Sequence, residues 1–285
     1  MIIQEKYKLS NGVEIPKLGL GTWFIPDDRA AQAVRDAVKL GYRHIDTAQA
    51  YGNERGVGEG VKSCGIKRSE IFVTTKLAAE AKSYETAAKA IDGSLLTAGL
   101  DYFDLMLIHA PQPWSDFRGG SYSEGNREAW RALEDAYKAG KLRAIGISNF
   151  EKADIDSLLS ECEISPMVNQ LLAHISNTPF ELIEYNKKCG MVTEAYSPIA
   201  HGEILKNQQL ISMAERYKVS VSQLCIRYTL QLDTLPLPKT ANPEHMAENA
   251  QLDFEISDQD MQTLKSIDTI ESYGEYSIFP VFSKK

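Results

Sequence analysis

Short apolar runs that end in a polar residue recur along the chain, and each is followed by a stretch with helical spacing of its apolar positions. These runs predict eight β-strands, at residues 18–22, 44–46, 71–76, 105–109, 144–149, 167–170, 191–196 and 235–239. Their ends lie about 31 residues apart on average, the length of one strand–helix unit. Regular alternation of strands and helices is typical of a parallel sheet that is covered by helices.

The stretches between these runs carry apolar residues at the three- and four-residue spacing of an amphipathic helix. The clearest sets are Ala30, Ala33, Val34, Ala37 and Val38; Trp130, Leu133, Ala136 and Tyr137; and Leu210, Met213, Ala214 and Tyr217. Gly41 and Gly140 follow the first two sets, at the position where a glycine commonly ends a helix. We therefore expect each helix to bury one face and these two to end beside their glycines.

Eight strand–helix units predict an α/β fold, a closed (β/α)8 TIM barrel that forms one domain over residues 1–285. Segments 7–9 and 13–15, joined around Asn11-Gly12, predict an N-terminal β-hairpin, which we expect to cover the bottom of the barrel. The segment after Asp268 is rich in aromatic residues and is expected to pack as a C-terminal tail over the barrel mouth. The alternative for this segment is a loosely ordered terminus.

The composition, 43% hydrophobic and 25% charged over 285 residues, is that of a globular protein and excludes collagen-like, coiled-coil and disordered chains. A formal net charge of −8 makes nucleic acid and anionic membrane lipid unsuitable partners. The four cysteines lie far apart, which predicts reduced, buried thiols in a cytoplasmic protein. We expect neither a signal peptide nor a membrane span, because no apolar run is long enough. No interface motif is present, so a monomer is expected.

Polar residues end most of the predicted strands. They are Asp46, Lys76, His109, Asn149, Gln170, Tyr196 and Lys239. In a barrel of parallel strands these ends converge on one face, where the active sites of such barrels lie. One polar strand end is ordinary turn chemistry, but seven on one rim indicate a functional site.

Three of these residues, Asp46, Lys76 and His109, form a set with Tyr51 that suits acid catalysis. Tyr51 lies five residues after Asp46, on the loop that follows the second strand. A lysine ammonium lowers the pKa of a nearby phenol, so Lys76 is expected to activate Tyr51 as a proton donor. Asp46 would balance the charge of Lys76, and His109 would orient a carbonyl oxygen. The set suits protonation of an alkoxide as hydride reaches a carbonyl carbon. The alternative is a salt bridge, a loop tyrosine and a core histidine without a common role.

Several motifs closely resemble those of the aldo-keto reductase family, in particular its bacterial branch with the diketogluconate reductases. They are residues 18–23 (LGLGTW), 41–54 (GYRHIDTAQAYGNE), 75–77 (TKL), 101–109 (DYFDLMLIH), 145–150 (IGISNF), 168–170 (VNQ), 195–198 (AYSP) and 238–240 (PKT). The resemblance implies an NADPH-dependent oxidoreductase that reduces aldehydes and ketones to alcohols on a TIM barrel. It implies a catalytic tetrad of Asp46, Tyr51, Lys76 and His109, with Tyr51 as the general acid.

The same resemblance implies the cofactor and substrate contacts. Ser148, Asn149 and Gln170 would hold the carboxamide of the nicotinamide, Tyr196 would stack on its ring, and residues 239–249 would hold the adenosine phosphate. The implied cofactor-binding set is Thr22, Trp23, Asp46, Ser148, Asn149, Gln170, Tyr196, Ser197, Lys239, Thr240, His245, Glu248 and Asn249. The implied substrate-binding set is Trp23, Tyr51, His109 and Trp114. A small carbonyl compound is the expected partner, and no metal is expected because the histidines lack metal-ligand spacing.

The phosphate assignment has separate support in the sequence. Asn242, Pro243 and Glu244 form an N-cap followed by a proline at the first helical position. Lys239 precedes this helix start, after the eighth strand, where barrel enzymes often bind phosphate. The alternative is a plain helix cap.

Some positions depart from the family pattern. Ala110 stands where the family often has Trp, and alanines follow Leu77 where it often has an aromatic residue, which predicts a wider pocket. The stretch 171–175 (LLAHI) matches no family motif. His245 stands where the family usually has an arginine, and a histidine binds phosphate less strongly than an arginine does. We therefore expect a weakened preference for NADPH, with some use of NADH.

Two further motifs are incomplete, and one alternative function remains open. Residues 56–60 (GVGEG) are not a dinucleotide-binding G-x-G-x-x-G motif, and residues 146–150 (GISNF) lack the second glycine of a serine hydrolase elbow. Some relatives of this fold are nicotinamide-binding regulatory subunits of channels. Oxidation of NADPH by a carbonyl compound would distinguish an enzyme from such a binding module.

Overall fold

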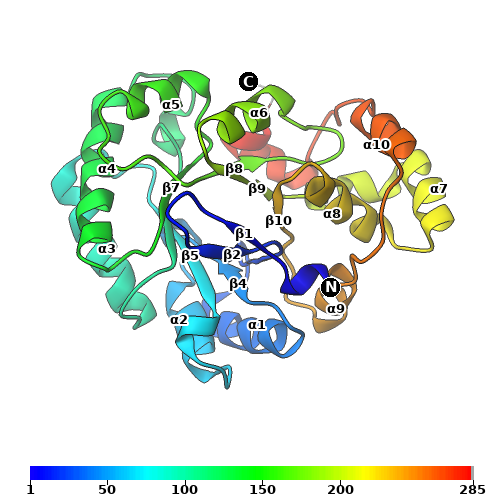
Figure 1. Ribbon diagram of the computed structural model, residues 1–285, viewed down its shortest axis with the longest axis horizontal. Helices are drawn as coiled ribbons and strands as arrows, with labels where there is room; N and C mark the ends of the chain where they lie inside the picture. Colours follow the sequence, from blue (N-terminus) through cyan, green and yellow to red (C-terminus); the bar gives the residue numbers. More distant parts are fainter. Residues whose placement is uncertain (284–285) are drawn as a thin grey trace.

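Eight parallel strands surround a common axis in the computed structural model, which describes residues 1–283 (Figure 1). They are β3 (Leu20–Gly21), β4 (His44–Asp46), β5 (Phe72–Leu77), β6 (Leu105–Ile108), β7 (Ile145–Ser148), β8 (Val168–Leu172), β9 (Val192–Tyr196) and β10 (Leu235–Leu237). Each strand pairs with the next in chain order. Gly21 pairs in parallel with Lys239, and its N–H donates to the Pro238 carbonyl. These contacts join the first strand to the last, so the predicted (β/α)8 barrel is confirmed.

Helices cover the outside of the barrel (Figure 1). They are α1 (Asp27–Lys39), α2 (Glu54–Ser63), α3 (Tyr84–Ala98), α4 (Ser123–Lys138), α5 (Lys152–Leu159), α6 (Phe180–Lys188), α7 (Gln208–Tyr217), α8 (Val221–Gln231), α9 (Pro243–Asn249) and α10 (Asp258–Lys265). The apolar face predicted for α1 is buried throughout. Gly41 (φ +102°) and Gly140 (φ +76°) adopt the left-handed conformation just beyond α1 and α4, as their positions predicted.

The inner strands are buried on both faces. Every residue of β5, β6 and β7 is buried, which explains their nearly continuous apolar runs. The strand predicted at 44–46 is confirmed as predicted, and the other seven differ from their predicted bounds by one or two residues at one or both ends. Two of these differences are the clearest. The segment 18–22 forms a strand only at Leu20–Gly21, where the backbone pairs with β4. Strand β8 continues past Gln170 to Leu172, because Leu171 and Leu172 pair with β9. Gln170 therefore lies inside a strand, not at its end.

The predicted N-terminal hairpin consists of β1 (Lys6–Lys8) and β2 (Glu14–Pro16). Gly12, at φ +88°, donates its N–H to the Leu9 carbonyl and closes the turn. The central turn residues are therefore Ser10 and Asn11, and Gly12 takes the left-handed position that follows them. The Tyr7 hydroxyl donates to the carbonyl of Thr234, just before β10. The hairpin thus lies against the N-terminal ends of the strands, as expected.

The C-terminal tail packs at the opposite end of the barrel. It contains the short 3-10 turns η6 (Gly274–Ile278) and η7 (Pro280–Phe282), drawn in red in Figure 1. The ring centroid of Trp23 lies 5.0 Å from the ring centroid of Phe279 and 6.0 Å from that of Phe282. Trp23 follows β3, so these contacts hold the tail over the carboxyl ends of the strands. The predicted tail over the barrel mouth is confirmed.

Further 3-10 turns connect the main elements. They are η1 (Ile2–Gln4), η2 (Gln49–Tyr51), η3 (Arg68–Glu70), η4 (Trp114–Asp116) and η5 (Ala200–Lys206). The four cysteines are free thiols, but only Cys225 is buried, and Cys64, Cys162 and Cys189 are half-buried. Burial was thus predicted correctly for one of them. Among the described residues, no helix is both long and apolar enough to cross a membrane.

Candidate active site

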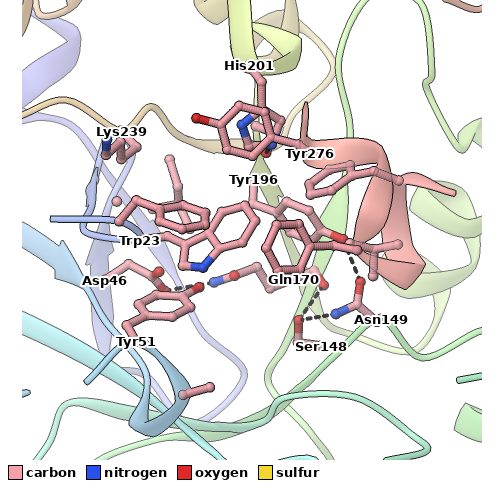
Figure 2. A pocket seen from close by; sticks show the side chains of 18 of the residues that line it. Trp23, Asp46, Tyr51, Ser148, Asn149, Gln170, Tyr196, His201, Lys239 and Tyr276 are labelled. Atoms are coloured by element: carbon pink, nitrogen blue, oxygen red, sulfur yellow. Dashed lines mark hydrogen bonds between the residues drawn. The ribbon is translucent and has the colours of Figure 1, made fainter. Parts of the chain in front are cut away.

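A cavity of about 530 Å³ opens at the carboxyl ends of the strands (Figure 2). Eleven of the residues predicted for the site line it: Trp23, Asp46, Tyr51, His109, Trp114, Ser148, Asn149, Gln170, Tyr196, Ser197 and Lys239. Aromatic residues of the tail form another part of its wall. The strand ends therefore converge as the barrel fold requires.

The other predicted residues lie outside the cavity lining. Lys76 is buried behind Tyr51. Thr22 is also buried, and its hydroxyl donates a hydrogen bond to the Asp46 carbonyl. Thr240, His245, Glu248 and Asn249 lie just before α9 or on it, and none of them lines the cavity. His245 is exposed on this helix. The N-cap predicted at Asn242 is present, because its side chain accepts from the Glu244 N–H.

Lys76 is the centre of a buried hydrogen-bond cluster. Its Nζ donates to Asp46 Oδ1 at 2.6 Å, to the Thr47 carbonyl at 3.0 Å and to the Tyr51 hydroxyl oxygen at 3.1 Å. These three bonds use all the protons of the ammonium group. Burial lowers the pKa of Lys76, but the negative charge of Asp46 and the contact with Tyr51 outweigh burial and raise it. Lys76 is therefore held as a cation.

The environment of Tyr51 corrects one expectation. Burial raises the pKa of the Tyr51 phenol above its ordinary value, although the charge of Lys76 acts to lower it. The predicted lowering by Lys76 is present but is smaller than the effect of burial. Tyr51 thus holds its proton at neutral pH. Because its oxygen accepts from Lys76, its own O–H is left to donate into the cavity.

His109 is a neutral imidazole beside Tyr51. Burial, together with the nearby charge of Lys76, holds the pKa of His109 well below its usual range. The ring lies edge-on to Tyr51 at 5.7 Å and to Trp114 at 5.1 Å between centroids. Among the described residues, its Nδ1 is buried without a hydrogen-bond partner. A neutral imidazole still has one N–H, which can orient an oxygen in the cavity.

Polar side chains from β7 and β9 form a chain along another side of the cavity (Figure 2). The Tyr196 hydroxyl donates to Asn149 Oδ1 at 2.7 Å, and Asn149 Nδ2 donates to Ser148 Oγ at 3.1 Å. Ser148 Oγ donates in turn to the Gln170 carbonyl. Asn149 has a φ of +62°, a conformation that asparagine tolerates better than most residues. The arrangement fixes the polar groups before any ligand arrives.

The match to known proteins decides the family. A model of the aldo/keto reductase family matches residues 17–269, which is most of the chain. The chain belongs to the aldo/keto reductase family. It is therefore an oxidoreductase of the class that acts on carbonyl groups with a nicotinamide cofactor, and the family predicted from its motifs is confirmed.

Relatives of this aldo/keto reductase align with nearly its whole length. Glyoxal reductase of Bacillus subtilis is 41% identical and aligns with 95% of this chain and 96% of its own. An aldo/keto reductase from Brucella melitensis has a crystal structure with a TM-score of 0.86 at 38% identity, covering 93% of this chain and 99% of its own. An aldo-keto reductase from Bombyx mori, solved in complex with NADP, has a TM-score of 0.85 at 31% identity, covering 96% of both chains.

The position of Ala110 bears on the expectation of a wider pocket in this aldo/keto reductase. Ala110 is fully buried, its carbonyl accepts from Lys82 Nζ at 2.9 Å, and it does not line the cavity. Trp114 of η4 lies over His109 and forms the wall at this point. Leu77 is also fully buried and contributes no lining. Position 110 therefore does not border the cavity, and a pocket wider than in relatives stays a prediction.

Sequence reasoning missed Glu194, a buried acid of this aldo/keto reductase next to the tetrad. Glu194 lies on β9 opposite Gln170 of β8, and it is fully buried. Burial and the negative charge of Asp46 raise the pKa of Glu194 to about 8. A charged residue in the middle of the apolar run 191–196 was the signal that could have revealed it. His201 and the tail residue Tyr276, whose rings stack at 4.0 Å in the cavity wall, were also missed as lining residues.

Proposed function

We propose that this enzyme reduces aldehydes and ketones to alcohols with NADPH, and that Tyr51 is the general acid. The observation that carries the proposal is the bonding of Lys76, which uses its three protons on Asp46, Thr47 and Tyr51. This bonding leaves the Tyr51 proton directed away from Lys76, and Tyr51 lines the cavity. The Bombyx mori relative, solved with NADP, supports the choice of cofactor.

The acceptor oxygens of the cavity fit the amide group of a nicotinamide. A carboxamide needs acceptors for its two N–H groups and a donor for its oxygen. Gln170 lines the cavity, and its Nε2 is already occupied by two carboxyl groups, so its Oε1 is left as an acceptor. Ser148 Oγ and Asn149 Oδ1 lie beside it as further acceptors, because the Ser148 hydroxyl donates to the Gln170 carbonyl and Asn149 Nδ2 donates to the His109 carbonyl and to Ser148 Oγ. Tyr196, fixed by its bond to Asn149, offers a flat ring for stacking.

The remaining predicted contacts extend from this point. Lys239 lines the far part of the cavity with an ammonium that can meet a phosphate charge. Thr22, Trp23, Ser197, Thr240, His245, Glu248 and Asn249 complete the proposed cofactor-binding set. Bound in this way, the nicotinamide would supply the hydride that reduces the carbonyl carbon.

Each tetrad residue then has a stated task. Tyr51 donates its proton to the carbonyl oxygen as negative charge develops there. The ammonium of Lys76, hydrogen-bonded to the same hydroxyl oxygen, stabilises the phenolate that remains. Asp46 holds Lys76 in position and balances its charge. His109 donates a hydrogen bond that orients the carbonyl, and because it is neutral it does not compete with Tyr51 as an acid.

The wall of the cavity indicates the kind of carbonyl compound. Trp23, Trp114, Phe279 and Phe282 contribute flat apolar surfaces around the proposed reaction centre. Small carbonyl compounds with an apolar or planar remainder fit these surfaces best. Because a relative is named glyoxal reductase, small dicarbonyl compounds belong in the same panel.

A turnover assay combined with a binding assay tests the proposal. NADPH oxidation is followed in the presence of keto acids, small dicarbonyls, sugars and aromatic aldehydes, and NADPH binding is followed by quenching of tryptophan fluorescence. We expect binding without any carbonyl, and oxidation only when a carbonyl is added. Tight binding without oxidation by any member of the panel would contradict the proposal and favour a nicotinamide-binding module.

A further inference from the structure

A second carboxyl group lies behind the tetrad, and the proposed mechanism does not use it. Glu194 projects from β9 into the barrel, where it is fully buried. Its Oε2 lies 2.7 Å from Gln170 Nε2, and its Oε1 lies 3.8 Å from His44 Nε2. Among the described residues, no hydrogen-bond partner reaches Oε1. A buried acid with a single strong contact requires an explanation, because burial of a carboxyl group is costly.

That single contact completes the bonding of the Gln170 amide. Gln170 Nε2 donates to Asp46 Oδ2 at 2.9 Å and to Glu194 Oε2 at 2.7 Å. A primary amide has two N–H groups, so both are used. Asp46 is paired with the ammonium of Lys76 and can only accept. The amide nitrogen must therefore face these two acids, and the amide oxygen must face away from them, toward the cavity that Gln170 lines.

A single hydrogen bond to Asp46 would not fix the orientation of the Gln170 amide. With Asp46 alone, the amide plane could turn about the axis of the N–H···O bond. The second bond, from a different strand, fixes the plane as well as the position. The Glu194 contact does not require a charge, because the carbonyl oxygen of a neutral carboxyl group also accepts. A neutral Glu194 also avoids placing a second negative charge next to Asp46.

We propose that Glu194 is a positioning residue, which holds the Gln170 amide with its oxygen presented to the carboxamide of the nicotinamide. The inference rests on the proposed function, since it assumes that Gln170 contacts the cofactor. The alternative is that Glu194 only fills space in the barrel core. The two accounts differ in what happens to cofactor affinity when the acceptor oxygen is removed.

The test compares three variants by their affinity for NADPH and their melting temperature, both measured without turnover. Glu194→Met keeps the length of the side chain and removes the acceptor. Glu194→Gln keeps an acceptor oxygen and the volume. The control is Glu54→Met, since Glu54 is also a buried glutamate, but its side-chain partners among residues 1–283 are Thr75 and Ser94. We expect Glu194→Met to weaken NADPH binding about tenfold, the scale of one lost hydrogen bond.

The other two variants give the matching expectations. Glu194→Gln should restore NADPH binding to within about twofold of the wild type, since one acceptor oxygen suffices. Glu54→Met should lower the melting temperature and leave NADPH binding nearly unchanged. In a Gln170→Leu background, Glu194→Met should cause no further loss of affinity, because the two residues act as one unit.

The outcomes separate this inference from the proposed function. If the wild type does not bind NADPH, the proposed function fails, and the inference fails with it. If the wild type binds but Glu194→Met binds equally well, the inference alone is wrong. Equal weakening in Glu194→Met and Glu194→Gln would also contradict it. Should Glu194→Met not fold, Glu194→Asp withdraws the carboxyl by one methylene and must weaken NADPH binding severalfold.

Discussion

The Tyr51 hydroxyl oxygen accepts a hydrogen bond from Lys76 Nζ at 3.1 Å, although burial raises the pKa of this phenol. In the proposed mechanism the two effects would serve different stages of a proton transfer. Burial would keep the proton on Tyr51 before the reaction, and the ammonium would stabilise the phenolate after it. An acid that is protonated at rest and has a stabilised conjugate base suits carbonyl reduction near neutral pH.

Replacing Tyr51 by Phe tests this role with the smallest change. The variant keeps the ring and loses only the hydroxyl, so folding and NADPH affinity should remain close to those of the wild type. Turnover should fall by ~10² to 10⁴-fold, the usual contribution of a positioned general acid. Steady-state kinetics with the best carbonyl of the panel measures this. A variant that keeps more than about a tenth of wild-type turnover removes Tyr51 from the mechanism.

Replacing Lys76 by Met should affect both catalysis and stability. The phenolate of Tyr51 loses its stabilising charge, so turnover should fall by at least ~10²-fold. Asp46 is left buried without its cation, so the free energy of unfolding should fall by about 3 kcal/mol. Lys82→Met is the control, because Lys82 is also largely buried but bonds to Ala110 and Asn126, outside the cavity. Full activity of Lys76→Arg with a wild-type pH profile would disprove the argument, since a guanidinium is a poor substitute for a compact ammonium.

Replacing Ala110 by Trp should lower the stability of the protein and leave its choice of substrate unchanged. Ala110 is enclosed by the fold, so a tryptophan overpacks the core and should cost ~1–3 kcal/mol of unfolding free energy. The ratio of kcat/KM for bulky ketones to that for short aldehydes should stay constant. Trp114→Ala is the comparison, because Trp114 lines the cavity and its loss should raise this ratio. A selective loss of bulky ketones in Ala110→Trp would show that position 110 does border the substrate.

Cofactor choice can be tested at His245. This residue is exposed on α9 and does not line the cavity, so its contact with the 2′-phosphate of NADPH is a proposal that a substitution can test. His245→Arg adds a charged fork and should tighten NADPH binding by ~1–2 kcal/mol, with little effect on NADH. Dissociation constants for both cofactors measure the effect. An unchanged NADPH-to-NADH ratio places His245 outside the phosphate site.

The buried acid Glu194 predicts a pH dependence of stability. Its pKa is raised to about 8 in the folded protein by burial and by Asp46, whereas an unfolded chain releases this proton near pH ~4.3. Folding therefore takes up a proton between these values, and the contribution of Glu194 to stability is lost as pH rises from about 4.5 to about 8. Melting temperatures of the wild type and Glu194→Gln at pH 5 and pH 8 check this. From pH 5 to pH 8 the melting temperature of the wild type should fall relative to that of Glu194→Gln. An equal difference in melting temperature at both pH values would contradict the argument.

The barrel and most of its rim were predictable because strand ends and helix faces follow local rules. Apolar runs of the right length define the strands, and the polar residue at the end of each run then faces the mouth, as Asp46 and Tyr196 do. The contribution of neighbouring turns could not be predicted in the same way. Trp114 was expected at the site from the resemblance alone, because its place depends on the path of the turn after β6. Glu194 was missed because its contact with Gln170 depends on the pairing of β8 with β9, which no single strand reveals.

The wall formed by residues 273–282 is attached to the barrel by side-chain contacts and carries no strand of the sheet. Substitutions there would change the shape of the cavity without disturbing any backbone pairing of the barrel. The tetrad, in contrast, is built into the strands and their adjoining loops and depends on their register. Substrate range and chemical step can therefore diverge independently in this protein. An engineer who seeks a new carbonyl substrate should randomise the tail first and leave the strand ends unchanged.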